Sequence, residues 1–294
     1  MMKEKSPHLY GLLITAAGVA ILSPDGLLIR LVTADGATIL FWRGLLFAVG
    51  ILGYYFIRRG LGTFTLIRTM GLRGLLAGFL FCFSTCFFVL AITHTSVANA
   101  LVIIATAPLF SALFAWLILK ESVFLSTWIT IIVCVGGISL IFMGSLGGGS
   151  RHGDFYAILC AFMIAGQITT VRHAKNLDMV PSLGIAGILT ALIALPFASP
   201  LAITSISFGY LCILGLFVLP IAFGLITVGP RYISAPEVSL LMLMESILGP
   251  FWAWLVLHEV PERETVVGGA IVITTLIIHT GVTAWKKRRA AVKI

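Results

Sequence analysis

Long apolar runs, separated by short polar or charged connections, make up almost all of the 294-residue chain. A helix needs roughly 20 residues to cross the hydrocarbon core of a bilayer, which is about 30 Å thick. Each run has about that length, so the pattern predicts an all-α integral membrane protein with ten transmembrane helices. The expected spans are 9–31, 37–57, 71–92, 97–119, 123–143, 154–172, 181–199, 206–228, 234–257 and 264–284.

One of the apolar stretches occurs twice. Residues 95–121 and 233–259 align at a shift of 138, and they share an Ala-Trp-Leu run and a final Glu. A Gly-rich piece at 144–153 separates the fifth span from the sixth. Because five is odd, the second set of five helices must insert upside down, and such inverted repeats are a transporter architecture with the substrate site near the midplane. The chain is therefore expected to divide into a first five-helix repeat (1–145), a linker (146–153) and a second, inverted repeat with a basic tail (154–294).

The composition agrees with a membrane protein. Hydrophobic residues make up 60% of the chain and charged residues only 10%, with a mean hydropathy of +1.12. Soluble domains carry about 25% charged residues. All five cysteines lie inside apolar runs, and no His or Cys spacing matches a zinc site, so neither a metal nor another cofactor is expected.

The net charge of +8 comes mainly from the connections and the C-terminal tail, which favours a role in membrane orientation over nucleic-acid binding. If the N-terminus is inside, fifteen Lys and Arg residues fall on the cytoplasmic side. Three, Arg30, Arg151 and Arg263, fall on the other side, and Arg43 lies within a span. This asymmetry predicts a multi-pass protein of the bacterial inner membrane with both termini in the cytoplasm.

Ser23, Pro24 and Asp25 interrupt the first apolar run. Proline removes a backbone donor from a helix, and the freed carbonyl groups can face a cavity in the membrane interior. These residues are therefore candidates for a substrate site. The alternative is a simple proline kink, with Asp25 reaching the outer interface.

Arg43 in the second span and Glu245 in the ninth are charged residues deep in apolar helices. A charge at such a depth costs at least ~2.5 kcal/mol unless it is paired or hydrated. At about 1.5 Å per residue, Arg43, Asp25 and Glu245 fall at similar depths. Arg43 is therefore expected to pair with Asp25 or Glu245, or else to extend to the outer surface. Glu245 is expected to face the interior, on one helix face with Met242, as a functional carboxylate or a structural hydrogen-bonding group.

Further candidates are polar or aromatic but uncharged. Asn99 and Gln167 can bind an amino or carboxylate group, or can tie two helices together. Phe83 and Phe87 belong to a stripe at helical spacing that either packs the third span or lines a site. The six histidines lie at span ends or, for His8, in the N-terminal arm, and this distribution does not predict a proton relay.

Three short motifs carry a resemblance to a known family. They are APLF leading to AWLILKE at 107–121, GPFWAWL at 249–255 and FWR at 41–43. They resemble the drug/metabolite transporter superfamily with its EamA repeats, and the run LMLME at 241–245 resembles the aromatic amino-acid exporters of the YddG type. The resemblance implies export of amino acids, aromatic and other neutral ones, or of related small metabolites from the cytoplasm.

The expected function is alternating-access export and not an enzymatic reaction, so no catalytic residue is expected. The alternatives are a multidrug or cationic-compound exporter coupled to protons through Glu245, an intramembrane enzyme, and a structural scaffold. An enzyme would need a catalytic dyad or a metal site, and no Lys lies within a span. The expected partners are a small-molecule substrate and the lipid bilayer, without nucleic acid; the oligomeric state is open, and a monomer is compatible with the sequence. The candidate substrate-binding residues are Ser23, Pro24, Asp25, Trp42, Arg43, Phe83, Phe87, Asn99, Gln167, Met242 and Glu245.

The charge asymmetry predicts that the Gly-rich linker lies outside the cell. A single cysteine introduced at Gly148 is expected to react with a membrane-impermeant thiol reagent added from the outside, whereas one at Arg59, in an inner connection, should not. Labelling of the Gly148 position only after the inner face has been opened would contradict this orientation.

Overall fold

The computed structural model describes residues 7–95, 97–141, 150–258 and 263–292, and every regular element within these ranges is helical. The α-helices are α1 (Pro7–Leu22), α2 (Asp25–Arg30), α3 (Gly36–Arg59), α4 (Gly62–His94), α5 (Val97–Ile104), α6 (Ala107–Leu117), α7 (Leu125–Ile141), α8 (Arg151–His173), α9 (Pro181–Ala194), α10 (Ser205–Ile213), α11 (Leu219–Val228), α12 (Ala235–Met242), α13 (Glu245–Leu257) and α14 (Arg263–Val292). Shorter elements are η2 (Leu195–Phe197), η3 (Leu214–Val218, a π-helix) and η4 (Gly229–Arg231).

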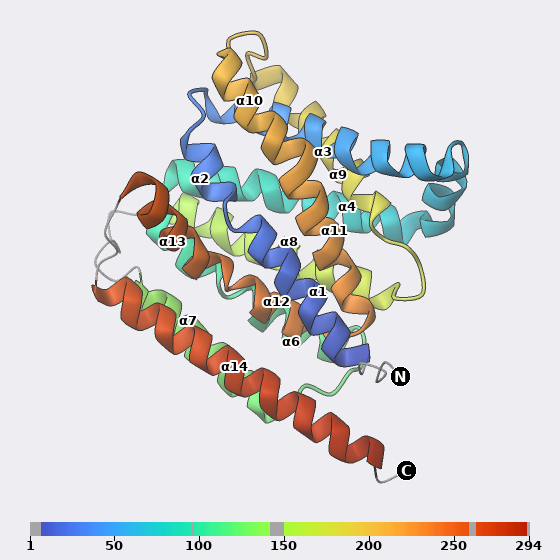
Figure 1. Cartoon of the computed structure of the whole chain (residues 1–294), viewed down its shortest axis with the longest axis vertical. Helices are drawn as coiled ribbons and strands as arrows, with labels where there is room; N and C mark the ends of the chain where they lie inside the picture. Colours follow the sequence, from blue (N-terminus) through green and yellow to red (C-terminus); the bar gives the residue numbers. More distant parts are fainter. Residues whose placement is uncertain (1–6, 96, 142–149, 259–262, 293–294) are drawn as a thin grey trace.

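Taken along the chain, these helices combine into ten spans. Figure 1 shows how the helices are arranged. Within the described residues, six helical segments are long and apolar enough to cross a membrane by length and composition, and three shorter apolar helices accompany them. The remaining span, the ninth along the chain, consists of α12 and α13 in succession. The predicted fold class, an all-α membrane protein with ten spans in two inverted five-helix repeats, is confirmed.

Several spans consist of two helices, and two of the interruptions are related by the internal repeat. The first span breaks between α1 and α2 at Pro24, as expected. The fourth span breaks between Ile104 and Ala107, and the ninth between Met242 and Glu245. These are the positions that the shift of 138 superimposes, although the hydrophobic pattern alone indicated two continuous helices.

The Gly-rich connection between the halves lies mostly outside the described residues, which resume at 150. Ser150 caps α8, which begins at Arg151, so the sixth span starts three residues before its expected position at 154. The basic arm before Pro7 and the stretch 259–262 after the ninth span also lie outside the described residues.

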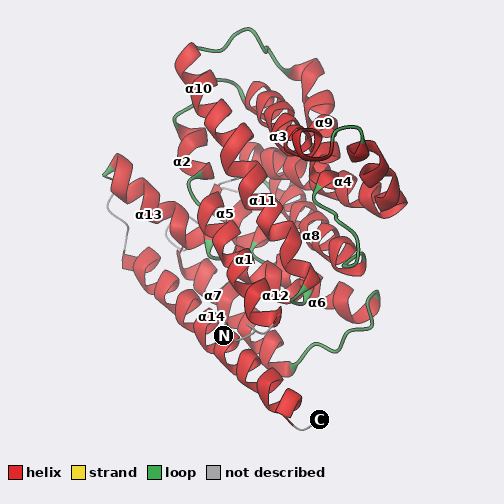
Figure 2. Cartoon of the chain, turned by 45° about the vertical axis from the view of Figure 1, so that its right-hand side comes forward, coloured by secondary structure: helices red, strands yellow, loops and turns green. Residues whose placement is uncertain are grey.

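The two halves of the chain interleave. α3 and α4 of the first half pack against α9 of the second, α4 also packs along α8, and α1 packs against α11. α7 and α14 pair with each other along one edge of the molecule (Figures 1 and 2). The interior is therefore built from helices of both halves, which is where a transporter of inverted repeats forms its substrate site.

The outward-facing side chains are apolar and the helix contacts are made by small residues. Leu72, Ile132 and Ile277 are exposed by 65% or more of their surface. Ala77 and Ala161, at helix contacts, are fully buried. Since lipid is as apolar as these side chains, small residues that let helices approach closely provide much of the packing in membranes.

Asp35 fixes the start of the second span. Its carboxylate accepts hydrogen bonds from the Thr38 hydroxyl (2.6 Å) and the Thr38 backbone nitrogen (2.9 Å). These bonds, chiefly that from the hydroxyl, lower the pKa of the Asp35 carboxyl below its usual range. Gly60, with a φ of 55°, ends the same helix. Asp35 and Gly60 therefore fix where α3 begins and ends, and so fix the depth of Arg43 within the span.

α3 and α9 touch backbone to backbone at Gly44 and Gly187. A Cβ atom added to Gly187 would lie 2.6 Å from the carbonyl oxygen of Gly44, and one added to Gly44 would lie 2.9 Å from that of Gly187. Neither position has room for a side chain, because the opposing atoms belong to the backbone of a packed helix.

Substituting Gly187→Val is expected to destabilise the protein by about 1–3 kcal/mol, the usual cost of overpacking. Gly53→Val, also on α3, is the matched control, since nothing lies within 4 Å of a Cβ at that position. Thermal unfolding in detergent measures both variants. Equal stability of the two would contradict a backbone contact at Gly187.

Candidate functional site

The break in the first span is tied to the ninth span. Ser23 is buried; its hydroxyl donates to the Ala20 carbonyl (2.7 Å) and accepts from Trp252 Nε1 (2.7 Å). Pro24 precedes α2, and Asp25 is the first residue of that helix. Asp25 is only 7% exposed, so the alternative of a simple kink that sends this carboxylate to the outer interface is wrong.

Arg43 and Asp25 form a buried ion pair. Arg43 Nη2 donates to Asp25 Oδ2 at 2.5 Å, and the two side chains are 14% and 11% exposed. The pair supplies the partner that a cation within a membrane requires. Of the two expected partners of Arg43 the structure selects Asp25, and Arg43 does not extend to the outer surface.

This ion pair leaves one donor and one acceptor unused. Arg43 Nε and Asp25 Oδ1 are buried, and neither has a hydrogen-bond partner in the described part of the chain. Buried polar atoms are hydrogen-bonded in the great majority of cases, because leaving them unpaired is costly. A ligand that carries both an acceptor and a donor would satisfy the two atoms together.

Glu245 is the first residue of α13, directly after the break in the ninth span. The positive end of the helix dipole favours a carboxylate at this place. The carboxylate interacts electrostatically with Asp25 and Arg43, but forms no hydrogen bond or ion pair with the residues that the structure describes. With all three groups ionised, the site has a net charge of −1, which a proton or a cationic group of the substrate would neutralise.

A small cavity lies beside the ion pair and has a volume of about 40 Å³. Three of its lining residues are the aromatic rings of Phe47, Phe81 and Phe223, with centroids 4.8 to 6.0 Å apart. The other lining residues are Leu40, Arg43, Gly44, Thr85, Gly187, Thr190 and Leu219. A cavity of this size holds only a few waters, so the two halves must separate to admit a larger molecule.

Phe83 and Phe87 lie away from this cavity. Phe87 stacks on Tyr156 of α8 at 6.2 Å between ring centroids, and Phe83 packs on Phe87 at 5.9 Å. α4 turns Phe81 and Thr85 towards the cavity instead. Because α4 carries apolar residues on every face, the spacing of these residues in the sequence could not show which face would line the interior.

The remaining candidates also lie outside the cavity lining. Trp42 Nε1 donates to a carbonyl of the connection between α9 and α10 (3.1 Å). Asn99 Nδ2 contacts Thr95 Oγ1 at 3.5 Å near the start of the fourth span. Gln167 is buried within α8, and Met242 packs into the core at the end of α12, directly before the break.

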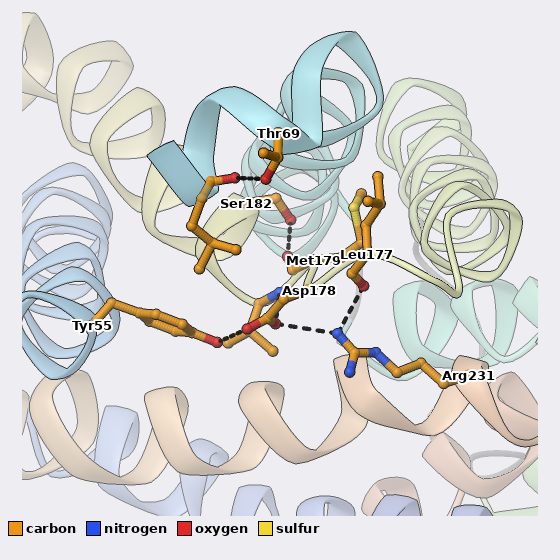
Figure 3. A network of polar contacts seen from close by, with 9 residues as sticks. Tyr55, Thr69, Leu177, Asp178, Met179, Ser182 and Arg231 are labelled. Atoms are coloured by element: carbon orange, nitrogen blue, oxygen red, sulfur yellow. Dashed lines mark hydrogen bonds and ion pairs between the residues drawn. The ribbon is translucent and has the colours of Figure 1, made fainter. Parts of the chain in front are cut away.

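Polar contacts close the inner end of the bundle, defined here as the end at which α1 begins. Tyr55 donates to Asp178 Oδ2 (2.7 Å), and Arg231 Nη2 donates to the Leu177 carbonyl (2.7 Å) and lies 3.4 Å from Asp178 Oδ1 (Figure 3). These contacts connect α3, the loop between α8 and α9, and η4.

Arg172 makes a second connection at the inner end. Its Nε donates to Glu121 Oε1 (2.9 Å) and its Nη1 donates to the Pro230 carbonyl (2.8 Å). Arg172 therefore joins the end of the sixth span both to the connection after the fourth span and to η4 at the end of the eighth.

Glu237 is a buried carboxylate that the sequence interpretation did not single out. Its Oε1 lies 2.8 Å from His8 Nε2, and its Oε2 accepts from the backbone nitrogen (2.8 Å) and the hydroxyl (2.7 Å) of Ser234. His8, assigned to an N-terminal arm, is buried within α1. The capping-box spacing of Ser234 and Glu237 was the available signal.

Ten spans in two repeats around a charged interior site define a membrane transporter and not an enzyme. The chain belongs to the EamA-like transporter family, whose profile matches residues 9–143 and again residues 151–280.

The chain is similar to two known transporters and to one solved structure. The chain is 28% identical to the S-adenosylmethionine uptake transporter of Rickettsia prowazekii over 217 residues, covering 70% of this chain and 71% of that protein. It is 24% identical to the pseudopaline exporter CntI of Pseudomonas aeruginosa over 262 residues, covering 83% and 86%. A crystal structure superposes with a TM-score of 0.81 at 15% identity, over 94% of this chain and 98% of the other, which shows a shared fold. Transport of small metabolites is thus the activity of this family, and neither named relative is an aromatic amino-acid exporter.

The ion pair predicts a specific pattern of stability changes. Arg43→Gln and Asp25→Asn are each expected to cost about 3 kcal/mol, because each leaves a buried charge without its partner. The double variant should recover most of this loss, and a double-mutant cycle from unfolding in detergent measures the coupling. Arg58→Gln, at an exposed position of the same helix, is the control. Additive losses at Arg43 and Asp25 would contradict the pair.

Proposed function

We propose that this transporter exports a small zwitterionic metabolite of amino-acid type by alternating access. The observation that carries the proposal is the unused donor and acceptor of the central ion pair, Arg43 Nε and Asp25 Oδ1. Under this proposal the substrate carboxylate accepts from Arg43, and the substrate ammonium donates to Asp25. A molecule that lacks either the carboxylate or the ammonium would leave one of these two atoms unpaired, at a cost of about 1–3 kcal/mol.

Glu245 supplies a second carboxylate for the ammonium end of the substrate. It lies at the start of α13, and its charge interacts with those of Asp25 and Arg43. The net charge of −1 also supports a second candidate, a cationic substrate without a carboxylate. In both cases the positive group is held by Glu245 and Asp25, and the difference lies in whether Arg43 binds substrate.

The side chain of the substrate would contact the aromatic wall of the cavity. Phe47, Phe81 and Phe223 form this wall, next to Arg43. Aromatic and aliphatic groups pack well against such rings. The cavity is smaller than an amino acid, so binding requires an open state in which helices of the two halves move apart.

The export direction is proposed from orientation and from likeness to relatives. The Lys and Arg distribution supports cytoplasmic termini in the inner membrane. The exporter of Pseudomonas aeruginosa aligns over 83% of the chain, and the uptake transporter of Rickettsia prowazekii over 70%. Transport measured in everted and in right-side-out membrane vesicles distinguishes export from uptake.

The substrate class is tested by transport into proteoliposomes. A panel of labelled neutral amino acids, S-adenosylmethionine, amino-acid methyl esters, N-acetyl amino acids and a lipophilic quaternary cation serves as the probes. Transport of zwitterions but of neither the esters nor the acetylated forms is expected. Transport of the esters and the quaternary cation alone would select the cationic candidate. No flux of any probe, with or without a pH gradient, would count against both.

The substitution Glu245→Gln distinguishes substrate binding from proton binding as the role of this carboxylate. If Glu245 binds the substrate ammonium, the variant should transport the substrate at least about tenfold more slowly at every pH, as expected for a lost charge-assisted hydrogen bond. Loss of pH dependence alone would instead make Glu245 a proton site. Arg58→Gln, which removes an exposed charge of α3, is the control. Normal flux and normal pH response in Glu245→Gln would remove Glu245 from the site.

A further inference from the structure

The helix of the third span is broken near its beginning. α4 runs from Gly62 to His94, but Gly71 has a φ of 54° and a ψ of −145°, a conformation that glycine adopts far more readily than other residues. A bilayer core of about 30 Å needs roughly 20 helical residues, and the part of α4 after Gly71 already supplies these. Residues 62–70 are therefore a separate short helix, which follows α3 at the inner end of the bundle.

One face of this short helix packs on the rest of the protein. Met70 is buried, and it forms a cluster with Ile67, Leu177 and Met179. The last two residues belong to the loop between α8 and α9, and Figure 3 shows this loop together with Thr69 of the short helix. The short helix is thus fixed on the loop whose polar contacts close the inner end.

The opposite face is apolar and exposed. Ile57 at the end of α3, and Leu61, Phe64 and Leu72 after it, are each exposed by 60% or more. They lie where α3 turns into α4 at the edge of the molecule (Figure 1). Exposed apolar side chains continue along α4 into the span, at Leu75 for example, so the surface around this turn is continuous with the one that faces lipid.

Three arginines lie among these apolar side chains: Arg59, Arg68 and Arg73. All three are exposed, and none forms a hydrogen bond or an ion pair with the residues that the structure describes. Arg58, next to them, differs because it donates to the hydroxyl of Tyr54 (3.1 Å) and lies 5.7 Å from the centroid of that ring.

The chain itself offers these three arginines little negative charge. The sequence contains no Asp or Glu between Asp35 and Glu121. Two other arginines of the inner end, Arg172 and Arg231, each have a carboxylate partner. The anion that neutralises the three arginines must therefore come from outside the chain. At the boundary between acyl chains and water, that anion is the phosphate of a lipid headgroup.

We propose that the α3–α4 corner, defined as residues 57–73, binds anionic phospholipid of the inner leaflet through Arg59, Arg68 and Arg73. A guanidinium group donates two parallel hydrogen bonds to a phosphate, and the exposed apolar side chains contact the acyl chains beside it. A headgroup with a net negative charge is favoured over a zwitterionic one, whose own cation repels the arginines. The proposal is independent of the substrate and of the roles of Arg43 and Glu245.

Native mass spectrometry of the full chain in a non-ionic detergent, without substrate, tests the lipid preference. Phosphatidylglycerol and phosphatidylcholine with identical acyl chains are added in turn. Phosphatidylglycerol is expected to bind at least about tenfold more tightly, and its affinity should fall as salt is added, because exposed charges are screened. Equal affinity for the two lipids would overturn the proposal. Inorganic phosphate at the same concentration should not displace phosphatidylglycerol, and displacement would overturn lipid as the occupant.

Substitutions locate the lipid on the corner. Arg59→Gln, Arg68→Gln and Arg73→Gln are each expected to weaken phosphatidylglycerol binding about fivefold, which corresponds to about 1 kcal/mol for a cation at a charged bilayer surface. Binding of phosphatidylcholine should not change, and Arg68→Lys, which keeps the charge, should retain most of the affinity.

Arg151→Gln is the matched control, since it removes an exposed cation at the start of α8, at the opposite end of the bundle. It should bind phosphatidylglycerol as the wild type does. Thermal unfolding in lipid-free detergent checks that every variant folds, which is expected because all the substituted side chains are exposed. Wild-type affinity for phosphatidylglycerol in a folded variant that lacks all three arginines would overturn the proposal.

Discussion

A cation within the membrane needs an anion beside it, and this requirement organises the centre of the molecule. Arg43 lies deep in the second span, and its partner Asp25 reaches it only because the first span stops before Pro24 and resumes as α2. The hydrogen bond from Trp252 to Ser23 attaches that break to the ninth span. One electrostatic requirement thus links three spans from both repeats and explains why a helix-breaking sequence is tolerated inside the bilayer.

The sequence predicted the spans, the repeat and the charged layer, because length, hydropathy and buried charge each have a strong signal. It did not predict the breaks in the fourth and ninth spans. Pro108 marks the first of these, but Leu243 and Met244 carry no backbone signal in the second. Nor could the sequence show which face of α4 lines the cavity. The contact of His8 with Glu237 could not be predicted either, because residues 229 positions apart meet only through the tertiary fold.

The inner end and the central site are connected through one segment between the eighth and ninth spans. Pro230 accepts from Arg172, Arg231 binds the Leu177 carbonyl, and Ser234 binds the carboxylate that holds His8. Beyond this segment, α12 leads directly to the break before Glu245. A displacement of the segment would loosen several inner contacts at once and would be transmitted along α12 to the carboxylate at the centre.

The contact of Gly44 with Gly187 has a mechanical consequence. At this point the two backbones touch, and only the Cβ atoms of Ala48 and Thr190 lie beside the contact, so one helix can tilt on the other with little repacking of side chains. Both glycines also line the central cavity. The crossing of α3 and α9 therefore has the geometry of a fulcrum: a small change of angle there would widen the space next to Arg43 while the point of contact itself stays in place.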